Sequence, residues 1–499
     1  MIMNRWRVAV TPAEVPGLVD VRPGWVSDWS SWLRTAEVAP GMPFLVSPRF
    51  EYDVRLNGFF RSPRMWSSSP RTQVGYARDL AAFLTFVWTA RGVTRWDAVS
   101  DKDHLAYLYW RRHDPDGPLV AAATWNRELT GVNQFFRWAV WAGHVPTNPI
   151  PQQARRAAPV TAGWAGRSTL DEQRPATVAR DTSAARVQWL PAASYRRWRD
   201  VGVRGFTAHG LPEPGFRGRW AGRNAVFCDL MIRTGLRLSE QAALTIVEVP
   251  RERDGAAYQP FWLPEAIAKG GSARTVYVPG SVVSDLVAYR DCDRVEVIER
   301  ARAEGRYARI RRPLVVEDPY CRTPRATAVG GQRVKVASLT GEQRLRLLVE
   351  TEEGLEPAAW WLGEHGLPLS VARWKKMFEE ANDRCRAVSV ALAVHPHMLR
   401  HSFAVITLEQ LQRGHLAALG GLSDEQRGHY VRVFGDPLDW VRRLLGHRSV
   451  VSTQIYLHTL AELEAQTRRA LVPDDWTAPP ALADVNAVGS AQAIGGGAG

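Results

Sequence analysis

The first regular pattern of apolar and polar positions lies between residues 72 and 142, where three helices are predicted. The helix over residues 72–90 has four large apolar residues on one face, namely Leu80, Phe83, Leu84 and Val87. A second helix is predicted near residues 101–112 and a longer one near residues 122–142. The apolar stripe of the longest helix consists of Leu129, Val132, Phe135, Phe136, Ala139 and Val140. Because such stripes are stable only when another element covers them, we expect one all-helical block.

Further along the chain, helices alternate with an extended segment. A buried helix is predicted to end at a break formed by Thr234 and Gly235, and a new helix opens around Arg237. Two extended runs then flank Gly270 and Gly271, which indicates a β-hairpin. The pattern therefore predicts a mainly α fold with a small antiparallel β-sheet, in the α+β class.

The C-terminal part of the chain is predicted to be helical. In HPHMLRHSFAVI, a core face at helical spacing is formed by Leu399, Phe403 and Ile406. Asp436 and Pro437 have the character of an N-cap and a first helical residue, and Gly446 ends that helix. Its stripe consists of Leu438, Val441, Leu444 and Leu445. Ser449 can cap a second, short helix beyond Gly446.

Composition and charge indicate a folded chain that binds a polyanion. The 499 residues are 45% apolar and 10% aromatic, which suffices for the cores of two or three domains. The net charge is +13 and the isoelectric point is near 9.9, so nucleic acid is the natural partner. A membrane surface would also satisfy the charge. Against this, no apolar run approaches the roughly 20 residues that span a bilayer.

Cysteine usage and the absence of common cofactor motifs narrow the class of protein further. Four cysteines are scattered without a CxxC pair, namely Cys228, Cys292, Cys321 and Cys385. We therefore expect reduced thiols and a cytoplasmic location, in agreement with the lack of a signal-peptide core. The sequence contains no GxxxxGK[ST] phosphate loop and no HExxH zinc helix. No cofactor is therefore expected.

The stretch LLGHRSVVSTQIYLH carries a candidate nucleophile. It places His447 at a helix exit and Tyr456 nine residues later, in the next helix. A tyrosine hydroxyl has a pKa of about 10, so it attacks at neutral pH only where neighbours stabilise the phenolate. Taken alone, the stretch fits a half-buried tyrosine and a capping histidine equally well.

A second group of polar residues lies in HMLRH. His397, Arg400 and His401 are three and four residues apart on a helix face different from the core face. The planar fork of Arg400 matches two phosphate oxygens, and an imidazole can donate to a third position or accept a proton. Two alternatives are an ordinary basic surface and a metal site built from nearby histidines. The metal site is disfavoured because a cation would lie beside the guanidinium.

Arg237 and Glu240 form a third candidate pair, one helical turn apart. Gly235 permits a tight turn that directs Arg237 away from the core, and Glu240 could hold its guanidinium in place. A plain surface ion pair at this spacing is the alternative.

Lys269 is unusual because this chain almost always uses arginine for positive charge. Only five of the 64 basic residues are lysines. Lys269 lies where the chain enters the tip of the predicted hairpin. A lysine can be tuned to give up a proton, whereas an arginine in a protein effectively cannot. Lys269 is therefore a candidate general acid, with a solvated turn lysine as the alternative.

Together these residues resemble, in order, the active-site set of the tyrosine recombinase, or phage integrase, family. The set consists of Arg237, Lys269, His397, Arg400, His447 and Tyr456. The matching strings are TGLRLSE, AKGGSARTVYVP, HMLRH, LLGH and YLH. The resemblance covers roughly residues 70–475, with more chain than the family usually needs between Lys269 and His397 and between Arg400 and His447.

The resemblance implies a specific chemistry. Tyr456 would attack a DNA phosphodiester and form a 3′-phosphotyrosyl link, without metal or nucleotide. Arg237 and Arg400 would clamp the non-bridging oxygens, and Lys269 would protonate the 5′-oxygen. His397 and His447 would assist proton transfer and phosphate contacts. Glu240 and His401 would contact these groups and hold them in place without contacting the phosphate.

The resemblance also implies a domain order. Residues 1–65 match no known motif and form an extension of unknown role. Residues 66–150 are expected to be a helical core-binding domain that closes a clamp around DNA, followed by a basic linker over residues 151–186. Residues 187–475 would be the catalytic domain, and residues 476–499 a flexible tail.

The expected partners are double-stranded DNA and other protomers. A homo-oligomer, a tetramer on synapsed DNA, is implied, and partner recombinases are possible; a membrane is not expected. Integrase and transposase-like roles are both open. One alternative is a type IB topoisomerase or telomere resolvase, which reseals DNA without exchange. Another is a DNA-binding regulator that has lost catalysis, but neither Tyr456 nor Arg400 is missing.

Overall fold

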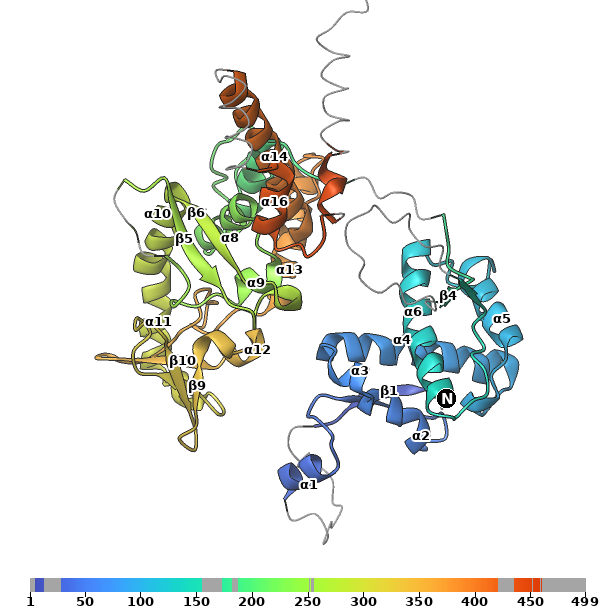
Figure 1. The fold of residues 1–499 in the computed structure, drawn as a ribbon. Helices are drawn as coiled ribbons and strands as arrows, with labels where there is room; N and C mark the ends of the chain where they lie inside the picture. Colours follow the sequence, from blue (N-terminus) through green and yellow to red (C-terminus); the bar gives the residue numbers. More distant parts are fainter. Residues whose placement is uncertain are drawn as a thin grey trace, which may run out of the picture. The chain divides into compact units, whose positions relative to one another are not determined.

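The computed structural model divides into two compact units, residues 1–185 and residues 186–499 (Figure 1). The structure describes residues 5–12, 28–154, 173–181, 187–250, 252, 255–420, 435–450, 452–457 and 459. The predicted tail, residues 476–499, lies outside these ranges, and so do residues 421–434 of the second insertion, which spans residues 414–436. Within them, no helix is both long and apolar enough to cross a membrane.

Three long helices form the centre of unit 1, as the sequence predicts. They are α4 (Pro70–Arg91), α5 (Asp101–Arg112) and α6 (Ala122–Trp141). The Ser69 side chain accepts a hydrogen bond from the Thr72 N–H at the start of α4, and Gly92 ends the helix with φ of 69°. The predicted stripe of α4 is buried. On α6, Val140 is 36% exposed, so its assignment to the core was wrong, because this position lies beyond the covered face.

Residues before α4 pack into the same core. The strands β1 (Arg7–Val10) and β2 (Pro43–Val46) pair antiparallel. The short helix α1 (Trp29–Thr35) lies between these strands in the chain. After β2 come α2 (Val54–Asn57), the 3₁₀ turn Gly58–Arg61 and α3 (Pro63–Trp66), and after α4 comes the 3₁₀ turn Trp96–Ala98. Their large apolar side chains join the cluster around α4 and α6, including Trp6, Leu45, Leu56, Phe59 and Phe60. The described residues 5–12 and 28–66 thus contribute to one hydrophobic core with the three long helices.

The described part of residues 151–186 belongs to unit 1. The strands β3 (Gln152–Ala154) and β4 (Gln173–Pro175) pair antiparallel. Beyond β4, the Trp125 indole donates to the Thr177 carbonyl at 2.8 Å, and Asn126 exchanges two hydrogen bonds with the Ala179 backbone. These contacts fix residues 173–179 on the surface of α6.

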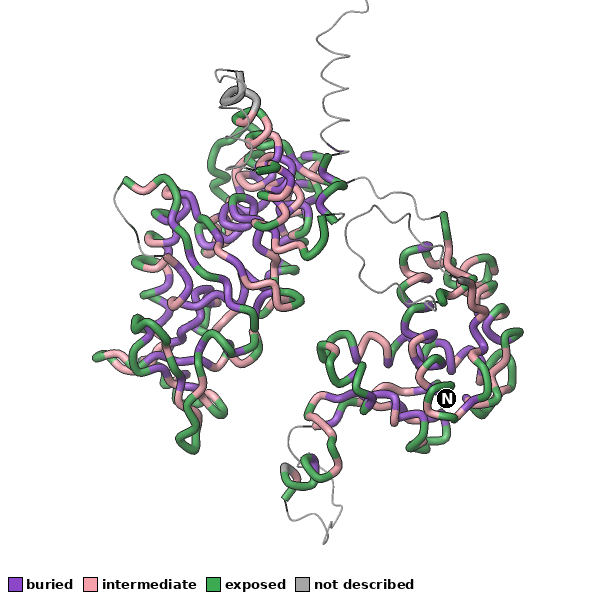
Figure 2. Tube along the Cα trace, in the orientation of Figure 1, coloured by how far each residue is buried: buried purple, intermediate pink, exposed green. Residues whose placement is uncertain are grey.

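Unit 2 is built around helices and one β-hairpin. The helices are α7 (Ala192–Trp198), α8 (Ala221–Thr234), α9 (Leu238–Ala242), α10 (Gly280–Tyr289), α13 (Val371–Ala387), α14 (Pro396–Gly420) and α16 (Pro437–Leu445), with π turns at Arg199–Val203 and Arg290–Arg294. The hairpin strands β5 (Tyr258–Leu263) and β6 (Arg274–Pro279) pair antiparallel, as predicted. Phe227 of α8 stacks on Trp374 of α13, with ring centroids 3.5 Å apart. Figure 2 shows buried residues running along the hairpin and the helices that cover it.

The insertion between Lys269 and His397 contains a second sheet that the sequence did not reveal. After α11 (Val295–Ala303) and the 3₁₀ turn Tyr307–Arg309 come β7 (Leu314–Val316), β8 (Arg325–Ala328), β9 (Arg333–Lys335), the 3₁₀ turn Val336–Ser338, α12 (Gly341–Arg344), β10 (Leu347–Thr351) and β11 (Gly354–Pro357). The strand order is β11-β10-β7-β8-β9, and only β10 and β7 are parallel. The buried Arg344–Glu248 ion pair, 2.8 Å long, ties this sheet to the rest of unit 2.

Candidate active site

Arg237 stands at the start of α9, where the chain leaves α8 through a tight turn. Gly235 ends α8 with φ of 65°, and a Cβ there would come within 2.3 Å of the Phe403 ring. Arg237 donates from Nη1 to Glu240 Oε1 at 2.7 Å, and its N–H donates to Oε2 at 3.0 Å. The predicted pair is therefore present, with the Arg237 side chain 18% exposed and that of Glu240 fully buried.

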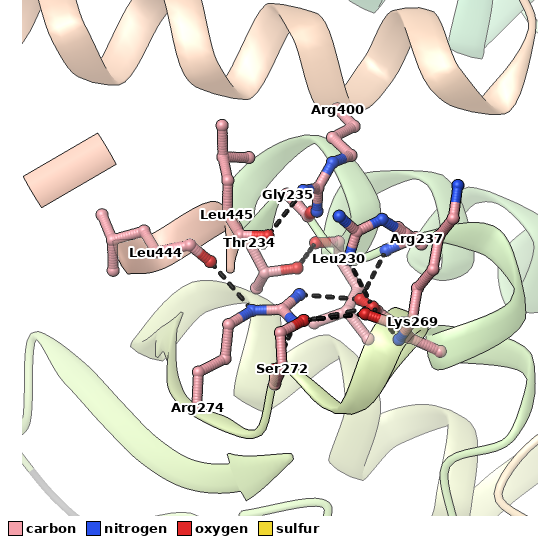
Figure 3. A network of polar contacts seen from close by, with 11 residues as sticks. Leu230, Thr234, Gly235, Arg237, Lys269, Ser272, Arg274, Arg400, Leu444 and Leu445 are labelled. Carbon is pink, nitrogen blue, oxygen red and sulfur yellow. Dashed lines mark hydrogen bonds and ion pairs between the residues drawn. The ribbon is translucent and has the colours of Figure 1, made fainter. Parts of the chain in front are cut away.

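Glu240 is the centre of a network that reaches the Lys269 turn. Figure 3 shows Arg237, Lys269 and Arg274, which belong to this network. Its Oε1 accepts the Lys269 N–H at 3.2 Å, and its Oε2 accepts Nη2 of Arg274 at 2.7 Å. Burial alone would raise the pKa of Glu240. The hydrogen bond and charge of Arg274, together with Arg237, instead lower this pKa to about 2. Glu240 is thus a permanent anion that holds two arginines and one backbone segment.

Lys269 begins a short 3₁₀ turn, Lys269–Gly271, inside the ten-residue connection between β5 and β6. Its side chain is exposed. His397, at the start of α14, is exposed as well. Desolvation of the His397 ring lowers its pKa, and the charges of Arg400, Arg237 and Lys269 lower it further. The predicted arginines, lysine and first histidine are therefore neighbours.

Arg400 is more deeply buried than the sequence pattern suggested. It is 1% exposed, whereas Phe403 and Ile406, which were assigned to the core face, are only partly buried. The reason is that α14 packs against both α8 and α16, so the face that bears Arg400 lies inside. Arg400 donates from Nη1 to the Gly235 carbonyl and from Nη2 to the Leu445 carbonyl at 2.6 Å. Burial and the charge of Arg237 lower its pKa to about 9.

Tyr456 lies within helical residues 452–457 and is 2% exposed. Its hydroxyl is 2.9 Å from Nδ1 of His401. Burial raises the pKa of Tyr456, while the charges of Arg400 and Arg237 oppose that rise. Burial lowers the pKa of His401 to about 4, so this imidazole is neutral at pH 7 and can accept a proton.

His447 is a second imidazole near the Tyr456 ring. It follows Gly446, which ends α16 with φ of 64° as predicted. The His447 and Tyr456 rings are stacked with centroids 6.5 Å apart, and Nδ1 of His447 is 3.0 Å from the hydroxyl of Thr453. Burial lowers the pKa of His447 to about 4.

Arg274 is a residue of this network that the sequence reasoning missed. It occupies the first position of β6 and is 6% exposed. A signal was present, because strand alternation places Arg274 on the same face as the buried Val276 and Val278. An arginine on the core face of a strand requires a buried partner.

The described residues include no group of three histidine, cysteine or acidic side chains that could hold a metal ion. What they do bring together is a tyrosine hydroxyl, neutral imidazoles, and a cluster of guanidinium groups around one carboxylate. Such a cluster has a net positive charge and suits an anionic substrate.

Sequence comparison gives matches over most of the chain. The profile described as "Phage integrase, N-terminal SAM-like domain" matches residues 64–143. "Tyrosine recombinase XerC" of Lactobacillus leichmannii is 22% identical, over 81% of this chain and 93% of that protein. "Tyrosine recombinase XerC" of Roseiflexus sp. (strain RS-1) is 27% identical, over 85% of this chain and 92% of that protein.

Solved structures with a similar chain trace include the Tn1549 transposon integrase in complex with transposon right end DNA. Its sequence is 13% identical and its TM-score is 0.45, and the match covers 83% of this chain and 98% of that one. The XerH site-specific recombinase bound to palindromic difH substrate has a TM-score of 0.44 at 13% identity, covering 81% of each chain. The family assignment rests on the sequence matches and on the motifs. By both, the chain is a member of the tyrosine recombinase family.

Proposed function

We propose that this enzyme is a site-specific DNA recombinase in which Tyr456 becomes covalently joined to DNA. The Tyr456 oxygen attacks a backbone phosphorus, a bond forms to the 3′-phosphate, and the bond to the 5′-oxygen breaks. The observation that carries the proposal is the Tyr456 hydroxyl, 2.9 Å from a neutral His401 and beside buried guanidinium groups.

The charge balance of the cluster favours a phosphodiester. Four cations lie in it, namely Arg237, Lys269, Arg274 and Arg400, and Glu240 neutralises one of them. A trigonal-bipyramidal phosphorane-like transition state spreads negative charge over its equatorial oxygens, and fixed donors stabilise it. In this proposal Arg237 and Arg400 contact those oxygens, and His397 and His447 complete the contacts.

In this proposal the two proton transfers are assigned to His401 and Lys269. Nδ1 of His401 lies 2.9 Å from the Tyr456 hydroxyl, so we assign His401 as the group that accepts the Tyr456 proton. Lys269 is exposed and cationic, so it gives its proton to the departing 5′-oxygen. The religation step reverses both transfers, and because one phosphodiester replaces another, it needs no nucleotide.

The substrate must displace the cover of the site. Tyr456 is 2% exposed and Arg400 is 1% exposed, so a phosphate cannot contact both groups in this arrangement. We infer that DNA binding rearranges the contacts that bury Arg400 and the Tyr456 ring, while the Tyr456 hydroxyl stays within hydrogen-bond reach of His401.

The partners follow from the charge and the family. A net charge of +13 favours double-stranded DNA, and strand exchange needs several protomers on two sites, for which we propose a tetramer. Partner recombinases, a cytoplasmic location, and a DNA clamp formed with residues 66–150 belong to the same proposal. A topoisomerase or telomere-resolvase activity is not favoured, because the relatives named above are recombinases.

The experiment uses nicked suicide duplexes tiled across the DNA that flanks the gene. Cleavage beside the nick releases a short strand, so the covalent protein–DNA adduct cannot reverse and is counted on a denaturing gel. Wild type should form an adduct, and Tyr456→Phe should form none because it lacks the attacking oxygen. Equal adduct from both proteins would show that another residue is the nucleophile.

A further inference from the structure

Arg274 makes contacts that join three parts of the site. Nη2 donates to Glu240 Oε2 at 2.7 Å, and Nε donates to the Leu444 carbonyl at 2.9 Å. Nη1 lies 3.4 Å from the Ser272 carbonyl and 3.5 Å from Glu240 Oε1. Every nitrogen of this guanidinium therefore has a partner, in contrast to an arginine that only neutralises a charge (Figure 3).

Each partner belongs to a segment that carries a reacting group. Glu240 also holds Arg237 and the Lys269 N–H. Ser272 lies in the same turn as Lys269, and its hydroxyl donates to the Lys269 carbonyl at 3.0 Å. Leu444 is in the last turn of α16, three residues before His447. Arg274 thus connects the Lys269 turn to the Arg237 helix on one side and to the His447 segment on the other.

The Lys269 turn and the end of α16 pack so closely that residue 446 has no room for a side chain. A Cβ at Gly446 would lie 3.0 Å from the Ser272 hydroxyl and 3.1 Å from Nη1 of Arg274. Arg448, just beyond His447, donates to the Gly270 carbonyl and makes a second link between the same segments. Because Arg448 is exposed, the buried link through Arg274 is the less screened of the two.

The Lys269 turn needs such a link. Gly270 and Gly271 both have positive φ, 69° and 71°, and a connection with two glycines has many accessible conformations. A general acid acts only when it is within hydrogen-bond reach of the leaving oxygen. Misplacement by about 1 Å can cost on the order of 100-fold in rate.

We propose that Arg274 is a positioning residue that fixes the Lys269 turn against the end of α16, and thereby sets where the leaving-group proton is delivered. This inference rests on the proposed function of Lys269. Arg274 itself does not touch the phosphate. Its effect on the reaction passes through the backbone of the turn and through Glu240.

The test compares two substrates that differ in their need for a proton. One is the native suicide duplex, and the other replaces the 5′-bridging oxygen by sulfur at the cleavage position mapped with wild type. A thiolate leaves without protonation, since a thiol has a pKa of about 8.5. Single-turnover adduct formation is measured for wild type, Lys269→Met, Arg274→Met, Arg274→Lys and Arg294→Met.

Arg294→Met is the matched control for the loss of a buried arginine. Arg294 is 3% exposed, donates to the Pro357 and Ala359 carbonyls and pairs with Glu356, all outside the site. We expect Arg274→Met to lose about 100-fold on the native duplex and less than about 10-fold on the sulfur duplex, like Lys269→Met. Arg294→Met should have the same rate ratio for the two substrates as wild type.

Three outcomes are decisive. An equal loss on both substrates for Arg274→Met would overturn the inference, because it would mean a general loss of structure. Arg274→Lys keeps a cation beside Glu240, so the fold should survive, but the lysine cannot also reach the Leu444 carbonyl. A wild-type rate of adduct formation by Arg274→Lys would likewise overturn the inference. A wild-type protein that forms no adduct on any duplex would refute the proposed function itself. The inference about Arg274 would then lose its premise.

Discussion

Replacing Glu240 by glutamine should destabilise unit 2 in a way that depends on pH. The carboxylate is fully buried between the guanidinium groups of Arg237 and Arg274 and accepts the Lys269 N–H. Glutamine keeps the shape and one acceptor oxygen but removes the negative charge. Two buried or half-buried cations then lack a counter-charge, which is costly in a low-dielectric interior.

The pKa of Glu240 sets the expected loss in the free energy of unfolding. Its value of about 2, against an ordinary value of 4.5, means that the folded state favours the charged form by about 3 kcal/mol. This agrees with the roughly 3–5 kcal/mol lost when one partner of a buried pair is removed. The pKa is lowered on folding, so this stability is fully present above pH 4.5 and is lost as the pH falls towards 2.

The assay is a urea titration of the full chain, with amide hydrogen exchange in α8 (Ala221–Thr234) as the reporter of unit 2. Glu240→Gln should be about 3 kcal/mol less stable than wild type at pH 7, and the difference should shrink as the pH approaches 2. The control is Glu296→Gln, an exposed carboxylate that pairs with Arg219 and Arg300 and should cost less than about 1 kcal/mol. A Glu240→Gln protein as stable as wild type at pH 7, or a difference unchanged between pH 5 and pH 3, would refute the charge network.

Two further substitutions test other parts of the site. Lys269→Arg should retain DNA binding in a gel-shift assay yet lose adduct formation, since arginine keeps the charge but does not release a proton; normal cleavage by this variant would remove the general-acid role. Gly235→Ala should cost about 2–4 kcal/mol in the same urea titration, because φ is 65° and the new Cβ would lie 2.3 Å from the Phe403 ring. Gly305→Ala, with φ of 64° and open space around it, should cost only about 1 kcal/mol, and equal losses for the two would argue against the steric contact.

Features decided within a few residues of one another were predictable from the sequence. The helix α16 begins where the Asp436 side chain accepts the Leu438 N–H and ends at Gly446, both as expected. The hairpin of β5 and β6 and the Arg237–Glu240 contact were likewise predicted. In each case the spacing, the cap or the turn residue acts locally, so no knowledge of the rest of the chain is needed.

The choice of candidate site residues also came from the sequence, because their types and order match a family. Their roles in catalysis remain predictions for the experiments above. What the sequence could not supply was their burial. Arg400 lies on a face of α14 that looked polar, yet α8 and α16 cover it.

Only the tertiary structure decided which groups meet. Strand alternation marks Arg274 as an arginine on the core face but does not identify its partners, which are Glu240, 34 residues earlier, and Leu444, 170 residues later. In the inserted sheet, the pairing of β7 with β10 likewise joins strands that are not neighbours in the chain, because β8 and β9 lie between them. Residue type and periodicity determine the local chemistry of a segment. Packing between elements decides which distant segment covers it, and therefore which charges are buried side by side. No single stretch of sequence contains this information.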